Sequence, residues 1–459
     1  MEQTRKRRFA LGRRGDVDMT EGSIPKHIIA FAFPLLVGNI FQQLYNMVDT
    51  WVVGNFVSSE AMAAVGSVGP IINMLIGFFL GLASGAGVVI SQYYGAKNDG
   101  GVSDTVHTSL AMTLILAVVF TGVGILMTPF MVDMMDTPPE VRPETVTYLT
   151  IYFSGVAGLM LYNMGAGILR AVGDSRRPFL FLVVSAVLNT VLDLVFVIAF
   201  GMGVAGVALA TILAQFVSAV LVTVSLLRAP SAIRLIPRKL KIVWPIMGRI
   251  VKVGIPAAVQ MAITSFSNIF VQKYINYFGA DAMAGWTAYA KVDALLFMPM
   301  QSIELASTTF VGQNLGKNQV ARARRGVSIS LGMAAAATVV CMVPVILGAP
   351  WTVAFFNSEP EVVRYGTLLL RTITPFYVLC IVNQVCSGAL RGAGNSRAPM
   401  IIMLLSFVVF RQIYLFVMAN FIRNEIIPIA MGYPAGWLVC SLTTLIYYLR
   451  ADLSKTRLV

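Results

Sequence analysis

The chain has 459 residues, of which 57% are hydrophobic and only 12% are charged. A soluble protein of this length needs far more charge on its surface, so the composition excludes soluble enzymes and soluble binding modules and predicts an all-α polytopic membrane protein. The net charge of +13 comes from basic residues in short connecting segments, which is typical of membrane topology rather than of nucleic-acid binding.

Apolar stretches long enough to cross a bilayer recur along the whole chain. A membrane-spanning helix needs about 20 mainly apolar residues, and the sequence meets that requirement twelve times. In chain order, the predicted transmembrane helices are 28–53, 62–90, 106–130, 147–169, 179–200, 203–227, 253–273, 282–311, 327–348, 366–389, 399–420 and 428–449.

These helices fall into two sets of six, separated by a polar and basic segment. The sequence therefore predicts two six-helix lobes, joined by a linker that rests on anionic lipid headgroups of the bilayer. The predicted boundaries are a basic tail at 1–26, an N-terminal lobe at 27–228, a linker at 229–252, a C-terminal lobe at 253–450 and a tail at 451–459.

One motif occurs twice, 221 positions apart: GILRAVGDSRRP at 167–178 returns as GALRGAGNSRAP at 388–399. The same shift carries Gln92 onto Gln313, so the chain is a tandem duplication of a unit of roughly 200 residues. Within the motif, glycine is expected to end one helix and proline to begin the next. Because six helices return the chain to the same side, the repeats are parallel and are predicted to form two lobes around a central cavity, as in many transporters.

The distribution of lysine and arginine predicts the orientation. If both termini are cytoplasmic, the cytoplasmic segments hold 27 of the 34 basic residues and the opposite side holds four. The positive-inside rule therefore predicts that both termini lie in the cytoplasm.

Two carboxylates are predicted to lie within the bilayer, where an ionised group costs roughly 2.5–3.5 kcal/mol on insertion scales. Asp49 is in the first helix and Asp193 in the fifth, with Asn189 one turn before Asp193 and Thr211 in the sixth helix. Burial and a second carboxylate both favour a bound proton, whereas the same oxygens would also suit Na⁺. The residues predict an ion site and leave the choice between H⁺ and Na⁺ open.

Several of these segments resemble the multidrug and toxic compound extrusion (MATE) antiporters. The resemblance is carried by Phe33-Pro34 with YNMVDT at 45–50, by NTVLD at 189–193 and by VGQNLG at 311–316. It extends over nearly all of the chain and is greatest to the bacterial DinF-like and MepA-like branch.

The resemblance implies export of amphipathic cationic drugs in exchange for H⁺ or Na⁺, by a monomer in the bacterial cytoplasmic membrane. It also implies that Asp49, Asn189, Asp193 and Thr211 form the ion-coupling site and that Pro34 is a hinge. A proline inside a helix removes one backbone hydrogen bond and kinks the helix, so a hinge and a static kink are equally consistent with the sequence.

The second repeat does not reproduce the acidic site, since the same shift carries Asp193 onto Tyr414 and Thr190 onto Arg411. An arginine in mid-membrane needs a partner, and Glu304 and Asp293 are the predicted candidates, either in a structural ion pair or as substrate contacts. The residues predicted to line the substrate cavity are Gln42, Tyr45, Tyr162, Met164, Gln260, Phe266, Asp293, Glu304 and Arg411.

Three other functions are weighed against antiport. A flippase for lipid-linked saccharides would need a strongly cationic cavity, and the spans offer only Arg411 and Lys291. An uncoupled facilitator would follow if the acids only bond neighbouring helices. An intramembrane enzyme or receptor is disfavoured because the sequence has no HExxH, Walker or CxxC motif and no nucleophile–base pair, so we expect no enzymatic activity, no cofactor and no resident metal.

Overall fold

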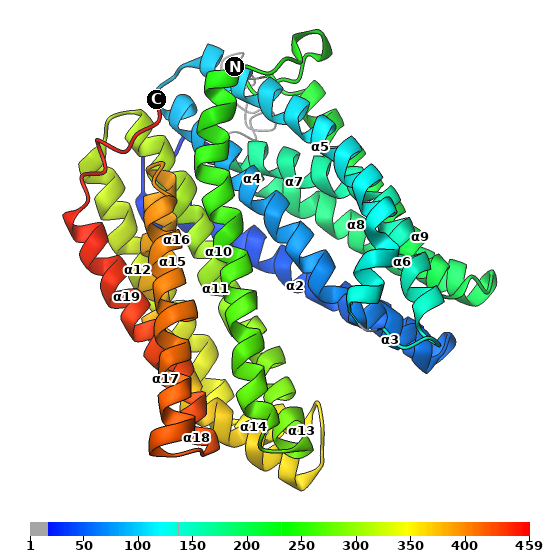
Figure 1. Cartoon of the computed structure of the whole chain (residues 1–459). Helices are drawn as coiled ribbons and strands as arrows, with labels where there is room; N and C mark the ends of the chain where they lie inside the picture. Colours follow the sequence, from blue (N-terminus) through cyan, green and yellow to red (C-terminus); the bar gives the residue numbers. More distant parts are fainter. Residues whose placement is uncertain (1–16, 136, 231) are drawn as a thin grey trace, which may run out of the picture. The chain divides into compact units, whose positions relative to one another are not determined.

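The computed structural model describes residues 17–135, 137–230 and 232–459. Every regular element in these residues is a helix (Figure 1), which confirms the predicted all-α fold. Residues 1–16 of the predicted basic tail and position 231 of the predicted linker lie outside the described residues.

The helices before the linker lie within residues 24–227. They are α2 (Ile24–Phe56), α3 (Ser59–Ser67), α4 (Gly69–Gly95), α5 (Asp99–Met134), α6 (Arg142–Ser154), α7 (Val156–Ala171), α8 (Arg176–Leu194), the π-helix η1 (Val195–Ala199) and α9 (Gly203–Leu227).

A short 3₁₀ turn, η2 (Pro237–Lys239), lies in the linker, and the remaining helices follow it. They are α10 (Trp244–Asn276), α11 (Ala280–Gly316), α12 (Val320–Leu347), α13 (Ala349–Ala354), α14 (Pro360–Ile373), η3 (Thr374–Phe376), α15 (Tyr377–Gly392), α16 (Arg397–Met403), η4 (Leu404–Phe410), α17 (Arg411–Val417), η5 (Met418–Ile422), α18 (Ile426–Ala430) and α19 (Gly432–Arg450).

Ten of the described helical stretches are long and apolar enough to cross a membrane, and α6 with α7 makes an eleventh if the two, bent by 47°, are taken as one span. The remaining predicted span, 282–311, lies on α11, which is 37 residues long. Charged residues along α11 lower its hydropathy, so length and composition alone do not mark it as a span. The chain is a multi-pass membrane protein.

Contacts divide the chain into two compact units, and the division falls inside α2. Unit 1 contains residues 17–19 and Val37–Gly254, whereas unit 2 contains Thr20–Leu36 and Ile255–Val459. Residues 27–36, predicted as part of the N-terminal lobe, thus pack with unit 2. A helix of 33 residues is long enough to pack against different neighbours along its length, and here the change comes just after Pro34, through which α2 continues.

The duplicated motif forms the same turn in both units. In unit 1 the amide of Asp174 donates to the carbonyl of Leu169 at 3.0 Å, and in unit 2 Asn395 donates to Leu390 at 2.9 Å. The glycines before them, Gly173 and Gly394, have φ of 85° and 94°, the left-handed conformation that closes a helix in this way. The predicted helix ends at glycine are confirmed, whereas the next helices begin at Arg176 and Arg397, two residues before the predicted prolines.

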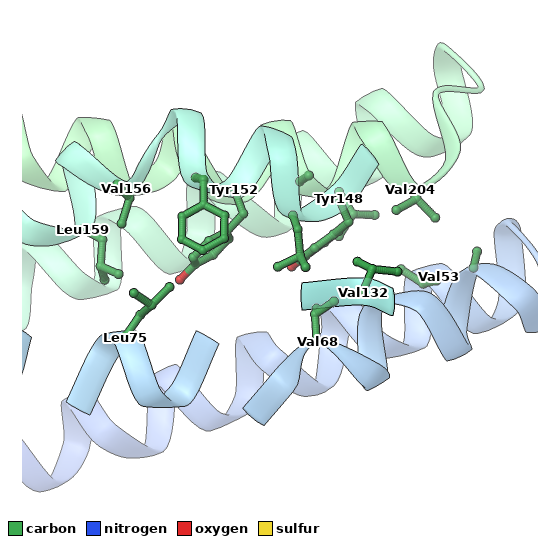
Figure 2. Packing of buried hydrophobic residues seen from close by; sticks show 14 of the residues in the cluster. Val53, Val68, Leu75, Val132, Tyr148, Tyr152, Val156, Leu159 and Val204 are labelled. Carbon is green, nitrogen blue, oxygen red and sulfur yellow. The ribbon is translucent and has the colours of Figure 1, made fainter. Parts of the chain in front are cut away.

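Unit 1 is held together by an apolar cluster between α2, α4, α5, α6, α7 and α9. Figure 2 shows Leu75 of α4, Tyr152 of α6 and Val204 of α9 within this cluster. In lipid, where the surroundings are themselves apolar, close packing of this kind provides much of the association energy between helices.

Unit 2 is organised around α11, which packs against α12, α14 and α15, and α15 in turn packs against α19. The end of α15 comes very close to α11, because a Cβ added to Gly388 would lie 2.9 Å from the carbonyl oxygen of Glu304. Only glycine allows this approach, which brings the side chains of the two helices into contact.

His107 of α5 fixes the linker to unit 1. Its Nε2 accepts a hydrogen bond from the amide of Ile236 at 3.0 Å, so the ring proton is on Nδ1 and is donated to the carbonyl of Ser103 at 2.6 Å. The neighbouring Thr108 accepts from the amide of Val243 at 3.1 Å. The linker is therefore bound by specific hydrogen bonds, with Arg238 and Lys239 exposed.

Candidate functional site

Two polar residues on α8 lie inside unit 1 and face the same direction. Asn189 and Asp193 are one helical turn apart, and their exposed fractions are 2% and 0%. Directly after them the helix changes to the π-helix η1. Short π-helical turns are rare and are frequent at functional sites.

Helix α2 brings Asp49 to the same place. The carboxyl groups of Asp49 and Asp193 are close enough to interact directly, and Tyr45 of α2 interacts with both. Thr211 of α9 lies beside the hydroxyl of Tyr148 of α6, and Tyr148 also interacts with both carboxyl groups. The structure thus gathers the four residues predicted to couple an ion, from three helices of one unit.

Several buried polar atoms of this group have no hydrogen-bond partner among the described residues. They are Oδ1 of Asp49, both carboxyl oxygens of Asp193 and both amide atoms of Asn189. An unpaired polar atom in the interior costs about 1–3 kcal/mol, and more if it is charged. A proton, a water molecule or a cation at this position would remove that cost.

The surroundings of the acids are aromatic and apolar. Tyr148 and Tyr152 stack with their ring centroids 6.3 Å apart, and Figure 2 shows both on the segment of α6 that faces the apolar cluster. Neither tyrosine was predicted from the sequence, although their spacing of one helical turn on a span was visible there. Low-polarity surroundings strengthen electrostatic interactions between the acids and whatever they bind.

The oxygens present would suit a hard monovalent cation as well as a proton. Carboxylate, amide and hydroxyl oxygens are the ligands that such cations prefer. In the described part of the chain there is no group of three or more His, Cys, Asp or Glu side chains arranged to hold a metal ion. The site offers the two acids together with neutral amide and hydroxyl oxygens.

The other predicted cavity residues of unit 1 differ in their positions. Gln42 lies beside Tyr45 on α2. Tyr162 of α7 is partly buried and donates its hydroxyl to the carbonyl of Pro178 at 3.1 Å. Met164 is only 3% exposed and packs inside the unit.

In unit 2, Gln260 and Glu304 form one buried network with Arg391. Arg391 donates to Glu304 Oε1 at 2.7 Å and to Gln260 Oε1 at 2.9 Å. The amide nitrogen of Gln260 donates to the carbonyl of Ser396 at 3.1 Å. These bonds tie together α10, α11, α15 and the turn before α16, and the role of Arg391 was not foreseen from the sequence.

The predicted partners of Arg411 are wrong. Glu304 pairs with Arg391, and Asp293 accepts hydrogen bonds from the hydroxyls of Tyr377 and Tyr289. Arg411 is 1% exposed and donates instead to Ser267 and, at 3.1 Å, to Asn268 Oδ1. Its guanidinium also lies over the rings of Tyr433 and Phe407, at 4.7 and 5.1 Å from their centroids.

These neighbours stabilise the cation without a carboxylate, since hydroxyl and amide oxygens accept its protons and aromatic faces attract its charge. Phe266, the last predicted cavity residue, is half exposed on α10 and meets the ring of Phe270 edge to face, with the ring centroids 5.0 Å apart.

The model of the MatE family matches this sequence twice, over residues 34–195 and 256–417. The chain belongs to the MatE family. The first match begins at Pro34 and ends just beyond Asp193, and the second covers the corresponding part of unit 2. The duplication seen in the sequence is therefore a duplication of the MatE unit.

Full-length relatives agree with this assignment. The chain is 28% identical over 431 residues to "Probable multidrug resistance protein YpnP" of Bacillus subtilis. This alignment covers 94% of this chain and 96% of the relative. It is 29% identical over 448 residues to "Probable multidrug resistance protein NorM" of Thermotoga maritima, with 94% of each chain covered. "Multidrug export protein MepA" of Staphylococcus haemolyticus is 22% identical over 385 residues, covering 83% and 84% of the two chains.

Solved structures share the fold. A MOP superfamily transporter from Pyrococcus furiosus superposes with a TM-score of 0.90 at 23% identity, covering 95% of this chain and 98% of that one. A structure described as the outward-facing conformation of a multidrug resistance MATE family transporter also has a TM-score of 0.90 at 23% identity, with 97% and 99% covered. As a member of the MatE family, the protein is a transporter rather than an enzyme.

Proposed function

We propose that this MatE protein is a secondary antiporter that exports amphipathic compounds, cationic drugs among them, in exchange for H⁺ or Na⁺. The observation that carries the proposal is the pair of buried acids, Asp49 and Asp193, with carboxyl oxygens that have no hydrogen-bond partner in the described part of the protein. Ionisable groups inside a membrane protein are costly and commonly mark an ion pathway.

The chemistry of coupling follows from the two carboxyl groups. Two carboxylates in one buried site repel each other, so one bound proton, or one cation held between them, stabilises the site. Asn189, one helical turn before Asp193, and Thr211, beside Tyr148, would add neutral oxygens. Binding and release of the ion would therefore change the charge of the site by one, and a cationic substrate would compete for the same acids.

Helix α2 connects this site to the rest of the chain. Asp49 lies on the part of α2 that packs in unit 1, whereas Pro34 lies on the part that packs in unit 2. We propose that Pro34 is a hinge, because the helix lacks one backbone hydrogen bond there and bends at lower cost. A change of charge at Asp49 would act on α2 itself, which links ion binding to exposure of the substrate site on alternate sides of the membrane.

We place both termini in the cytoplasm of a bacterial plasma membrane. The support is the bias of lysine and arginine toward the segments on one side, including the exposed Arg238 and Lys239 of the linker. Ion entry from outside would then drive export of the substrate.

The proposal is tested with purified protein in liposomes, by following a fluorescent organic cation under an imposed pH gradient and, separately, under a Na⁺ gradient. We expect one gradient to drive transport, and Asp49→Asn and Asp193→Asn to abolish it while the protein stays folded. Asp104→Asn is the matched control, because Asp104 is a half-exposed acid on α5 of the same unit, 3.9 Å from Lys241 and remote in sequence from the two acids. Transport that is unaffected by both gradients would indicate an uncoupled facilitator and would refute antiport.

A further inference from the structure

The C-terminal part of α10 carries a polar stripe on an exposed face. Ser265, Asn268, Gln272 and Asn276 follow one another at three- or four-residue spacing, so they share one side of the helix. Together with Ile269 and Lys273 they line an open recess of about 520 Å³. Recesses that hold small organic molecules are typically about 300–1,000 Å³.

This stripe is poorly suited to face lipid chains. Asn276 ends α10, and at about 1.5 Å per residue Asn268 lies about 12 Å and Ser265 about 16 Å along the helix from that end. Amide and hydroxyl groups at that depth are unfavourable in hydrocarbon. Since the stripe is open in this structure, water or a solute would satisfy these groups.

Arg411 lies directly behind the stripe. Its Nη2 donates to the Oδ1 of Asn268 at 3.1 Å, and Asn268 itself lines the recess. Within the described residues, no carboxylate forms an ion pair with Arg411, although the guanidinium is charged at any physiological pH and 1% exposed. Its charge reaches the recess through the hydrogen bond to Asn268.

The hydrogen bonds of the stripe set which groups remain for a ligand. Because Oδ1 of Asn268 accepts from Arg411, the amide NH₂ of Asn268 is the group left to donate. Gln272 donates to Oδ1 of Asn276 at 2.7 Å, which likewise leaves the amide NH₂ of Asn276 as a donor. Lys273 adds an ammonium group, and no lining residue of the recess is acidic.

We propose that this recess on α10 binds the anionic group, a carboxylate or phosphate, of an amphipathic substrate. The positive charges of Lys273 and Arg411 and the two amide donors complement a negative oxygen group, and the apolar side chains beside the stripe complement a hydrophobic body. The proposal rests on the proposed function and narrows its substrate class. Zwitterions, which carry an anionic group beside the cationic one, are preferred over simple cations.

Binding can be measured without any ion gradient. We would titrate the protein in lipid nanodiscs with three probes that share one pyrene body: 1-pyrenebutyrate, its methyl ester and the corresponding butylammonium, with empty nanodiscs subtracted for partitioning. We expect the carboxylate to bind roughly 10-fold more tightly than the ester. The ammonium should bind this recess no better than the ester.

Variants then assign the preference to the recess. Lys273→Gln should reduce the ratio of carboxylate to ester affinity roughly 5-fold, whereas Lys252→Gln, which removes the same charge at the other end of α10, should leave it unchanged. Arg411 is buried and Arg411→Gln risks misfolding, so Asn268→Asp is the second variant. It places a carboxylate against the guanidinium of Arg411, neutralises that charge and should reduce the ratio of carboxylate to ester affinity.

Equal affinity of wild type for carboxylate and ester would overturn the proposal. The proposal would also be overturned if Lys273→Gln and Asn268→Asp left the ratio of carboxylate to ester affinity unchanged. The same holds if Lys252→Gln reduced that ratio as much as Lys273→Gln does. Asp49→Asn should retain the ratio, so a failure of antiport and a failure of this inference are distinguishable. If the wild type shows no gradient-driven transport but keeps the ratio of carboxylate to ester affinity, only the antiport proposal is contradicted.

Discussion

Lys97 and Asn318 lie 221 positions apart, and both adopt a left-handed backbone conformation, with φ of 57° and 62°. Each follows the last turn of a long helix, α4 or α11. In both, the next amide reaches back to close the turn: Asn98 to Tyr93 at 3.0 Å and Gln319 to Asn314 at 2.8 Å. With Gly173 and Gly394, the two repeats thus share two pairs of identical helix ends, although most side chains around them differ.

The shared glycine turns should be required for stability. Gly173→Ala and Gly394→Ala each force a Cβ into the left-handed region, and the new atoms would lie 2.4 Å from the carbonyl oxygen of Val17 and 2.8 Å from that of Thr456. We expect a loss of at least about 1–2 kcal/mol for each, seen as a lower Tm in detergent. Gly248→Ala is the control, because nothing lies within 4 Å of its position in α10. If the Tm of Gly248→Ala fell as far as the Tm of the two glycine-turn variants, this explanation would be contradicted.

Breaking the Arg391–Glu304 pair should destabilise unit 2. Both side chains are largely buried, with exposed fractions of 13% and 14%. Glu304→Met leaves a buried charge on Arg391 and should cost about 3 kcal/mol. The double variant Glu304→Met/Arg391→Met should recover part of that loss in denaturant unfolding. Additive losses would show that the two charges are not coupled.

Replacing Pro34 should separate stability from transport. A proline inside a helix is about 3 kcal/mol less favourable than alanine, so Pro34→Ala should raise the Tm while reducing the rate of transport through a stiffer α2. Pro344→Ala in α12, a helix that belongs wholly to unit 2, should raise the Tm with transport unchanged. Wild-type transport by Pro34→Ala would identify the proline as a static kink.

The anchor of the linker can be tested at His107. His107→Leu leaves the amide of Ile236 without its acceptor, which should cost about 1–3 kcal/mol and free the linker. We expect faster tryptic cleavage at Arg238 and Lys239, measured on intact protein by mass spectrometry. His107→Gln retains an acceptor and should be cleaved more slowly than His107→Leu. Equal cleavage of wild type and both variants would contradict an anchoring role.

Much of this fold could be predicted because membrane helices must be long and apolar and because the repeat occurs twice in one chain. The grouping of Asp49, Asn189, Asp193 and Thr211 also follows from helical spacing and from depth. The partners of Arg411 could not be predicted in this way. Arg411 follows the π-helix η4, whose additional residue per turn rotates the downstream side chains relative to a regular α-helix.

The contacts of Glu304 show a second limit of prediction from the sequence. Its partner Arg391 is reached only because Gly388 lets α15 approach α11, and a glycine in a repeated motif does not reveal from the sequence which helix it will meet. Likewise, the passage of α2 from one unit to the other depends on its neighbours in space, whereas its own sequence is continuously helical.

That passage of α2 bears on how such a protein could have arisen. Residues 20–36 pack with the second unit, although they run into the start of the first repeat in the chain. In a half-length ancestor built like unit 1, this segment would have packed against a second copy of the protein, as in a domain-swapped dimer. Gene fusion would then have made permanent an exchange that already existed, and two fragments produced by cutting the present chain within its linker should function only when they are synthesised together.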